Sequence, residues 1–317
     1  MSLTEIIKNQ EFFKKLTEKK EKNNLSNAVL FFCEDEKTCK YVLILSALML
    51  QYPTFELMDE KCAEFVKIEN GADLDVKVFP KGEKLLVADS GEIVADAHVK
   101  PINMPYKIFL INNFDNSTEE AQNKLLKVLE EPPKNVYFLL SAKSEDRVLP
   151  TIKSRCDKIK ISPFAKEELE NLCQDTLALI LGGGYLGKTL ELAGKDDLKS
   201  IANLAVDIFC EMKSSKDVIK YSKKVLEEKE NLDLILQILS LAIEDMLKLK
   251  CESENLCKLK PYLSDLQEVE PEFSVQALCE ITKVISSLRE KIEFNANLTV
   301  AIDNFLLKIL EVKYLCK

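Results

Sequence analysis

The chain has 317 residues, of which 46% are hydrophobic and 31% are charged, and its formal net charge is −9. Such a composition is typical of a soluble globular protein with room for two or three domains, and the negative charge excludes a uniformly basic DNA-binding surface. No apolar run is long enough to span a membrane, and the charged N-terminus does not resemble a signal peptide, so we expect a cytoplasmic protein.

Strands and helices alternate in the first half of the chain, after a charged amphipathic helix at residues 1–22. Five short apolar segments are typical of buried strands: 28–32, 73–79, 106–112, 135–141 and 158–161. Helices are predicted between them, for example at 38–50. This alternation favours right-handed crossovers and a parallel sheet. We therefore predict an α/β domain over residues 1–162.

A second helix of this domain is predicted at 117–131. Ser117 is the expected N-cap, two glutamates follow in the first turn, and Pro132 and Pro133 end the helix. Its apolar residues recur at helical spacing. We expect this face to cover the sheet.

The strand pattern disappears after Pro163. Two short helices around Gly182–Gly184 predict a small helical domain over 163–205, and residues 206–317 are amphipathic and helical throughout. The sequence thus predicts three parts: 1–162, 163–205 and 206–317.

The loop after the first strand is the usual phosphate cradle of an open parallel sheet. A working cradle reads G-x-x-x-x-G-K-[ST]. The corresponding residues here are Cys33, Thr38, Cys39 and Lys40. Three carboxylates, Glu34–Glu36, stand where polyphosphate would lie and repel it. The loop is therefore a degenerate phosphate loop.

The acidic pair that handles magnesium is absent as well. The third predicted strand ends in Asn112 and Asn113, where an Asp–Glu pair is expected in a working ATPase. We therefore expect this chain to bind no ATP and no other cofactor. An ordinary Rossmann-like domain that never had such a site remains an alternative.

The ten cysteines are scattered and form no Cys-x-x-Cys pair. Cys33, Cys39 and Cys62 lack a fourth zinc ligand nearby, and the single histidine, His98, lies far along the chain. We interpret the cysteines as reduced, mostly buried thiols. No metal is expected.

Residues 119–156, EEAQNKLLKVLEEPPKNVYFLLSAKSEDRVLPTIKSRC, resemble the segment from the post-Walker-B helix to the SRC motif of bacterial clamp-loader AAA+ subunits. The combination of LEEPP with LPTIKSRC is specific. A weaker likeness extends over the remaining chain. It implies an AAA+ domain with a five-stranded parallel sheet, a small helical lid domain and an all-α C-terminal collar that holds an oligomer together.

Within that family, motor subunits keep an intact phosphate loop, whereas delta-prime subunits of the DNA polymerase III clamp loader lack it and keep the SRC motif. This chain resembles the second kind. The resemblance implies a five-subunit ring with gamma/tau motor subunits and a delta subunit, which loads the sliding clamp onto primer–template DNA. Many relatives carry a four-cysteine zinc module, of which only Cys62 remains here, so zinc is expected to be absent.

Arg155 is one of only three arginines among the 44 basic residues. The resemblance implies that it is an arginine finger for the ATP site of a neighbouring subunit. A guanidinium offers the γ-phosphoryl group a rigid fork of donors and keeps its proton. A surface arginine in a structural salt bridge is the alternative.

The residues around Arg155 are expected to support it. Ser154 and Cys156 complete the SRC motif and should fix the loop, because no histidine lies near enough in sequence to activate Cys156 as a nucleophile. Lys188 matches a position where motor subunits often carry a phosphate-sensing arginine, and here we interpret it as a surface lysine.

Three functions remain open on these residues. The first is a non-catalytic clamp-loader subunit that serves a neighbour's ATP site. The second is an ATP-hydrolysing motor subunit with an unorthodox phosphate loop. The third is a scaffold protein that keeps an inactive AAA+ domain for partner binding.

Overall fold

Five apolar segments form a parallel sheet in the computed structural model, which describes residues 2–294 and 297–315. The strands are β1 (Ala28–Phe32), β2 (Val76–Phe79), β3 (Lys107–Ile111), β4 (Val136–Ala142) and β5 (Asp157–Lys160), in the spatial order β2-β3-β4-β1-β5. All neighbouring pairs are parallel. The predicted five-stranded parallel sheet is confirmed. β1 and β3 are buried throughout, which explains their unbroken apolar runs.

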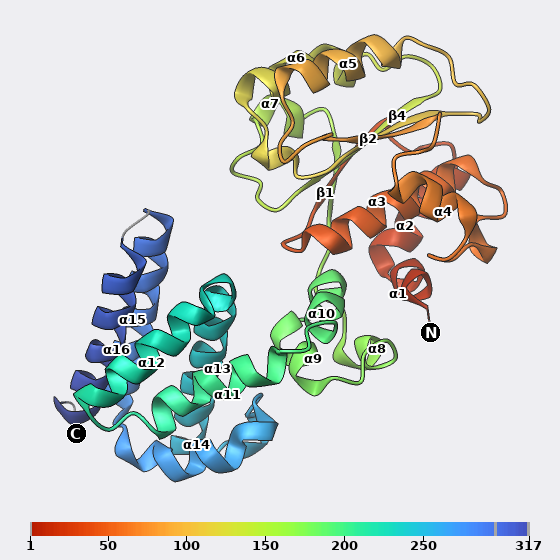
Figure 1. The fold of residues 1–317 in the computed structure, drawn as a ribbon. Helices are drawn as coiled ribbons and strands as arrows, with labels where there is room; N and C mark the ends of the chain where they lie inside the picture. Colours follow the sequence, from red (N-terminus) through yellow and green to blue (C-terminus); the bar gives the residue numbers. More distant parts are fainter. Residues whose placement is uncertain (1, 295–296, 316–317) are drawn as a thin grey trace. The chain divides into compact units, whose positions relative to one another are not determined.

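Helices cover both faces of the sheet. Figure 1 shows α5 and α6 side by side on one face and α3 on the other, in agreement with their contacts. Leu30 and Phe32 of β1 belong to the core on the α5–α6 side, while Val29 and Phe31 alternate with them. The helices of this region are α1 (Leu3–Asn9), α2 (Glu11–Glu21), α3 (Glu36–Gln51), α4 (Ala63–Glu69), α5 (Val87–Ala97), α6 (Glu119–Glu130), α7 (Pro150–Lys153) and α8 (Lys166–Glu170).

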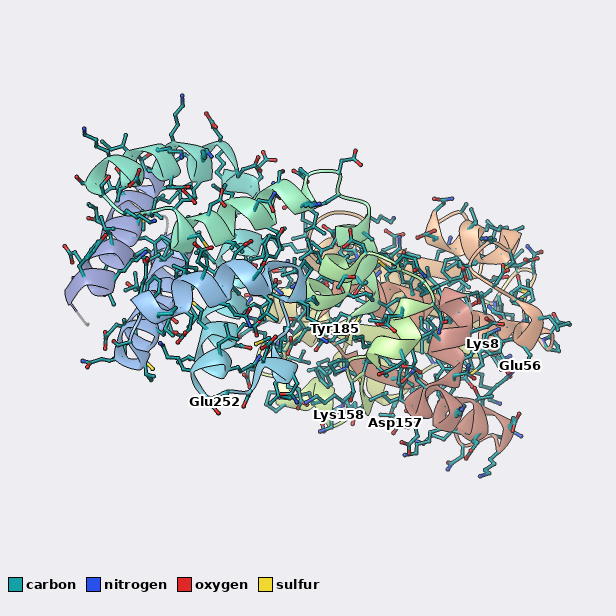
Figure 2. The ribbon with its side chains drawn as sticks, turned by 90° about the horizontal axis from the view of Figure 1, so that it is seen from below. Lys8, Glu56, Asp157, Lys158, Tyr185 and Glu252 are labelled. Atoms are coloured by element: carbon teal, nitrogen blue, oxygen red, sulfur yellow. The ribbon has the colours of Figure 1, made fainter. Side chains whose placement is uncertain are left out.

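β5 lies at one edge of the sheet. Its residues alternate between half-buried and exposed, and Lys158, labelled beside Asp157 in Figure 2, is one of the exposed ones. Exposed lysines on an edge strand oppose unwanted pairing with another chain.

Two helix boundaries differ from the sequence predictions. The single helix predicted at 1–22 is wrong, because Gln10 adopts an extended conformation and separates α1 from α2. Ser117 is not the N-cap of α6. Thr118 caps that helix by accepting a hydrogen bond from the backbone N–H of Ala121 at 3.2 Å, and the Ser117 hydroxyl instead donates to the carbonyl of Phe114.

The chain divides into two units, which we describe separately. The first comprises residues 1–174 and 182–190, and the second comprises 175–181 and 191–317. Residues 163–205, predicted as a small domain, contribute to both units. The three-part division remains a prediction.

The second unit is helical, as the sequence predicts for 206–317. Its longest helices form packed pairs, α15 with α16, α12 with α16 and α11 with α13. The remaining helices are α9 (Thr176–Gly182) and α10 (Leu186–Ala193), which cross the unit boundary, then α11 (Leu198–Cys210), α12 (Ser215–Glu227), α13 (Leu232–Lys250), α14 (Leu263–Val269), α15 (Val275–Glu293) and α16 (Leu298–Leu315). Single 3₁₀ turns lie at Phe55–Leu57, Phe114–Asn116, Lys229–Asn231, Glu254–Leu256, Lys260–Tyr262 and Glu270–Glu272. None of the helices in the described part of the chain has the length and apolarity needed to cross a membrane.

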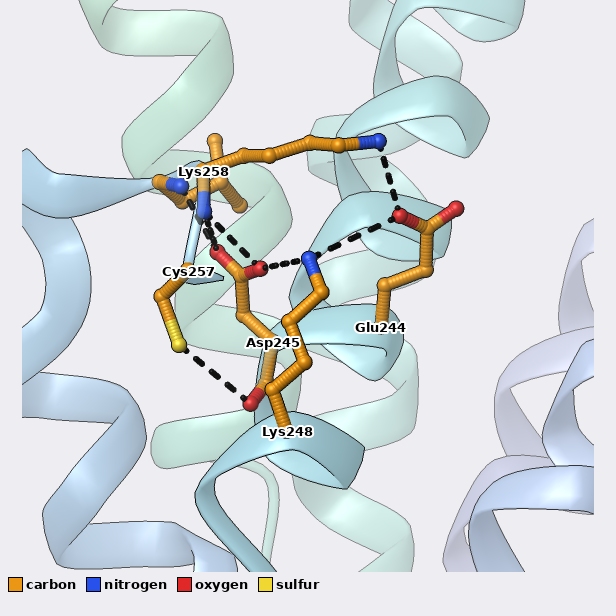
Figure 3. A network of polar contacts seen from close by, with 6 residues as sticks. Glu244, Asp245, Lys248, Cys257 and Lys258 are labelled. Carbon is orange, nitrogen blue, oxygen red and sulfur yellow. Dashed lines mark hydrogen bonds and ion pairs between the residues drawn. The ribbon is translucent and has the colours of Figure 1, made fainter. Parts of the chain in front are cut away.

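Asp245 of α13 is a fully buried carboxylate at the centre of a polar network (Figure 3). It accepts hydrogen bonds from the backbone N–H groups of Lys258, at 2.9 and 3.0 Å, and of Leu259, at 2.6 Å. The Lys248 ammonium lies 2.9 Å from the same carboxylate. A buried donor that loses its acceptor costs free energy, so Asp245 fixes the segment after α13 against that helix.

Candidate functional site

The degenerate phosphate loop is a short connection from β1 to α3. Asp35 is the N-cap of α3, and its carboxylate accepts hydrogen bonds from the Thr38 backbone N–H, at 3.0 Å, and from the Thr38 hydroxyl. In nucleotide-binding α/β proteins, the N–H groups at such a helix N-terminus bind phosphate. Here an acidic side chain of the protein takes up that donor.

The start of α10 rests on the same carboxylate, within the first unit. The backbone N–H of Lys188 donates to Asp35 at 3.3 Å, and that of Gly187 donates to the Thr38 hydroxyl at 3.1 Å. A Cβ at Gly187 would lie 2.2 Å from the Cβ of Lys37 and 2.6 Å from the Asp35 carboxylate, so only glycine permits this approach. Protein atoms therefore occupy the space over the loop.

The other residues of the predicted loop are also engaged elsewhere. Cys39 is buried and its thiol donates to the carbonyl of Cys33 at 3.8 Å. Hydrogen bonding with Cys33, together with burial, raises the pKa of the Cys39 thiol. Lys40 pairs with Glu69 of α4 at 3.2 Å. The structure thus brings Cys33, Thr38 and Cys39 together, but it directs Lys40 toward α4.

Asn112 and Asn113 follow β3, at the carboxyl ends of the parallel strands. Asn113 has φ +49°, a left-handed conformation that asparagine tolerates well, and its backbone N–H donates to the Ser141 hydroxyl at 3.3 Å. Neither side chain supplies a carboxylate for magnesium. Over residues 2–294 and 297–315, no group of three or more His, Cys, Asp or Glu side chains is arranged to hold a metal ion.

The SRC motif follows α7, whose first residue is Pro150. The Ser154 hydroxyl donates to the carbonyl of Thr151 at 3.0 Å and stabilises the end of this short helix. Cys156 is buried, and burial raises the pKa of its thiol to about 12. A protonated thiol is a poor nucleophile, which favours the packing role predicted for Cys156.

Arg155 is held by α6 and α7. Its Nε and Nη2 donate to one carboxylate oxygen of Glu130, at 3.1 and 2.7 Å, and its Nη1 donates to the carbonyl of Thr151 at 2.9 Å. The arginine side chain remains 28% exposed. The structural salt bridge that is the alternative role of Arg155 is therefore formed within this chain, without a neighbouring subunit.

Arg155 and the degenerate loop lie beyond opposite ends of the neighbouring strands β5 and β1. β5 runs parallel to β1, with Val29 opposite Asp157 and Phe32 opposite Lys160. Arg155 precedes β5, whereas Cys33 follows β1. The paired stretch from Val29 to Phe32 alone places these two ends about 10 Å apart, at ~3.3 Å per residue. Arg155 is therefore separated from the degenerate phosphate loop of its own chain.

Sequence reasoning missed two partners. From the sequence, Asp35 is expected only to repel polyphosphate, although an Asp three residues before Thr38 is a recognisable N-cap pattern. Glu130 was seen only as part of LEEPP, and no local signal pairs it with Arg155. Lys188 is half-buried, and its backbone N–H contacts the loop.

We expect Asp35→Ala to lower the free energy of unfolding by about 1–2 kcal/mol, the usual cost of losing an N-cap. Hydrogen exchange should accelerate at the backbone amides of Thr38 and Lys188, which lose their acceptor. Glu36→Ala is the matched control, because Glu36 is half exposed and forms a surface ion pair with Lys143. Unchanged exchange at both amides in Asp35→Ala would show that this carboxylate does not fasten α10.

Comparison with known proteins gives the following similarities. Residues 8–165 match the family model described as "DNA polymerase III, delta subunit". The delta' subunit of DNA polymerase III from Bacillus subtilis is 23% identical over 92% of this chain and 93% of its own length. A gamma subunit from Buchnera aphidicola is 28% identical over 44% of this chain.

The gamma subunits align only in part. The chain covers 30–39% of the length of three of them from Buchnera aphidicola. Among solved structures, a gamma-subunit-related protein of DNA polymerase III from Thermotoga maritima is 18% identical, with a TM-score of 0.47 over 96% of this chain and 100% of that one.

Proposed function

Since the chain belongs to the clamp-loader family of DNA polymerase III subunits, we propose that it is a delta-prime subunit that takes part in clamp loading without hydrolysing ATP itself. It joins gamma/tau motor subunits and a delta subunit in a five-subunit ring in the cytoplasm. That ring places the sliding clamp on primer–template DNA during replication. The chain contributes Arg155 to the ATP site of its neighbour.

The observation that carries this proposal is the position of the Asp35 carboxylate. It takes the N-terminal donor of α3 and supports α10, where a nucleotide-binding subunit would hold phosphate. Binding ATP there would require removal of these contacts and placement of polyphosphate beside three carboxylates, which is electrostatically unfavourable. Arg155, by contrast, remains partly exposed, and it lies before β5, beyond the opposite ends of the strands.

Equilibrium dialysis of the isolated chain against labelled ATP with magnesium tests the proposal against the motor-subunit alternative. We expect no saturable binding, and no rise in the thermal unfolding midpoint with ATP, because a ligand that binds the folded state must stabilise it. Binding with a midpoint that rises by several degrees, and that is abolished by substitutions in residues 33–40, would support an ATP-hydrolysing subunit instead.

The scaffold alternative makes a different prediction. A free-standing scaffold would not co-purify with clamp-loader subunits, whereas a delta-prime subunit would form a stable complex with them. The match to the Bacillus subtilis delta' subunit over almost the full length of both chains favours the second outcome.

A further inference from the structure

We propose that Glu130 is a positioning residue for Arg155: it holds the guanidinium so that its remaining donors are ready for the phosphate of a neighbouring subunit. This inference rests on the proposed function, because it assumes that Arg155 acts in trans. It adds a partner that lies outside the SRC motif. Glu130 is the last residue of α6 and comes just before Pro132 and Pro133.

Glu130 is set at a fixed place because α6 also holds the other end of the same segment. Gln122, buried within α6, donates to the carbonyl of Arg147 at 3.0 Å and accepts from the backbone N–H of Leu149 at 2.9 Å. α6 therefore fixes the start of α7 through Gln122, and it fixes Arg155, two residues after the end of α7, through Glu130. A supporting contact on the same rigid helix is what precise orientation of a functional side chain requires.

The contacts of Arg155 leave part of its fork open. A guanidinium carries five N–H groups, and three of them, on Nε, Nη2 and Nη1, are used by Glu130 and Thr151. One N–H remains on Nη1 and one on Nη2. Both terminal nitrogens of the guanidinium therefore keep a donor for phosphate, a group that arginine binds through charge-assisted hydrogen bonds. Glu130 thus orients the guanidinium without covering all of its donors.

Orientation affects rate because a long side chain loses rotamer freedom when it is fixed. An arginine already held by Glu130 and Thr151 has lost part of that freedom before the neighbour's nucleotide arrives, so less is lost in the transition state. Glu130 is 57% exposed, and exposed ion pairs have modest energies. We therefore expect a small but measurable contribution.

The contact can be tested in the isolated chain by ¹⁵N NMR of the arginine side chains, because the chain has only three arginines. The Nε–H of Arg155 should exchange more slowly with water than that of Arg289, whose nearest carboxylate atom, on Asp233, is 3.7 Å away. Glu130→Gln should weaken this protection, because the neutral amide oxygen is a poorer acceptor than the carboxylate. Glu131→Gln, a change of the exposed neighbouring glutamate, should leave it unchanged.

The role can be tested in the reconstituted complex by DNA- and clamp-stimulated ATP hydrolysis. Glu130→Gln should lower kcat about two- to five-fold, the effect of an exposed ion pair, with KM for ATP and complex assembly unchanged. Glu130→Gln should have no further effect in an Arg155→Ala background, because the guanidinium that Glu130 holds is then absent. Glu131→Gln should match the unsubstituted complex.

Four results overturn the inference. Faster hydrolysis with Glu130→Gln would mean that Glu130 masks Arg155, and an equal loss in the Arg155→Ala background would mean that Glu130 acts only on the fold. Unprotected Arg155 Nε–H in the isolated chain would exclude the contact itself. If Arg155→Ala has no effect on hydrolysis, the proposed function fails and this inference fails with it, while the NMR result still reports separately on the contact.

Discussion

Complexes reconstituted with Arg155→Lys or Arg155→Ala are expected to bind ATP almost normally, yet to hydrolyse it more slowly when stimulated by DNA and clamp, and to load clamps slowly. Lysine keeps the charge but loses the fork that pairs with two phosphate oxygens. It also loses the Nε and Nη2 donors that contact Glu130. The two substitutions should therefore have similar effects.

The size of this effect depends on what share of the total ATP hydrolysis comes from the site that Arg155 completes. An arginine finger contributes on the order of 10³–10⁵ in rate at the site that it completes. In the proposed ring the total rate should fall by less than this, because the other subunit boundaries would have arginine fingers of their own. Single-turnover measurement of ATP hydrolysis resolves the slow site from the remaining ones.

Arg147→Lys is the matched control for this experiment. Arg147 is exposed and precedes α7, and the contact of its segment with Gln122 is made by the backbone carbonyl, which the substitution retains. Hydrolysis should then be unchanged. Wild-type loading by both Arg155 variants in an intact complex would reduce Arg155 to a surface residue in a salt bridge.

The second large effect concerns stability. We expect Asp245→Ala to lower the free energy of unfolding of the second unit by about 2–6 kcal/mol, because it leaves the backbone N–H groups of Lys258 and Leu259 without their acceptor at about 1–3 kcal/mol each. Asp245 itself is fully buried. Hydrogen exchange at these two amides, measured together with thermal unfolding, reports the change locally, since a chain of two units need not unfold in one step.

Glu244→Gln is the matched control for Asp245. Glu244 is adjacent in sequence and lies 3.0 Å from the Lys258 ammonium, but its side chain is 50% exposed. Its loss should cost less than about 1 kcal/mol. Equal destabilisation by both substitutions would mean that the charge of this cluster, rather than the buried acceptor, holds the segment.

The sheet could be predicted because strands that are buried on both faces form short continuous runs of apolar residues. β1 and β3 are continuous apolar runs, and Pro150 and the proline pair at 132–133 mark a helix start and a helix end as single residues. Helix boundaries were less certain. Ser117 and Thr118 are both good N-caps by type, and only the backbone conformation around Phe114 selects Thr118.

The site could be predicted only as a set of residue types. The absence of glycines and of the acidic pair is visible in the sequence, but the contact between Asp35 and the start of α10 joins residues 153 positions apart. The pairing of Arg155 with Glu130 spans 25 positions. Such contacts depend on the tertiary fold, and no local periodicity records them.

The central claim is tested most directly by mixing this chain with clamp-loader motor and delta subunits and measuring the assembled mass together with stimulated ATP hydrolysis. We predict a five-subunit complex that contains this chain and whose full rate of hydrolysis requires Arg155. Failure to assemble, or a complex whose hydrolysis is the same with the unsubstituted chain and with Arg155→Ala, would contradict the account.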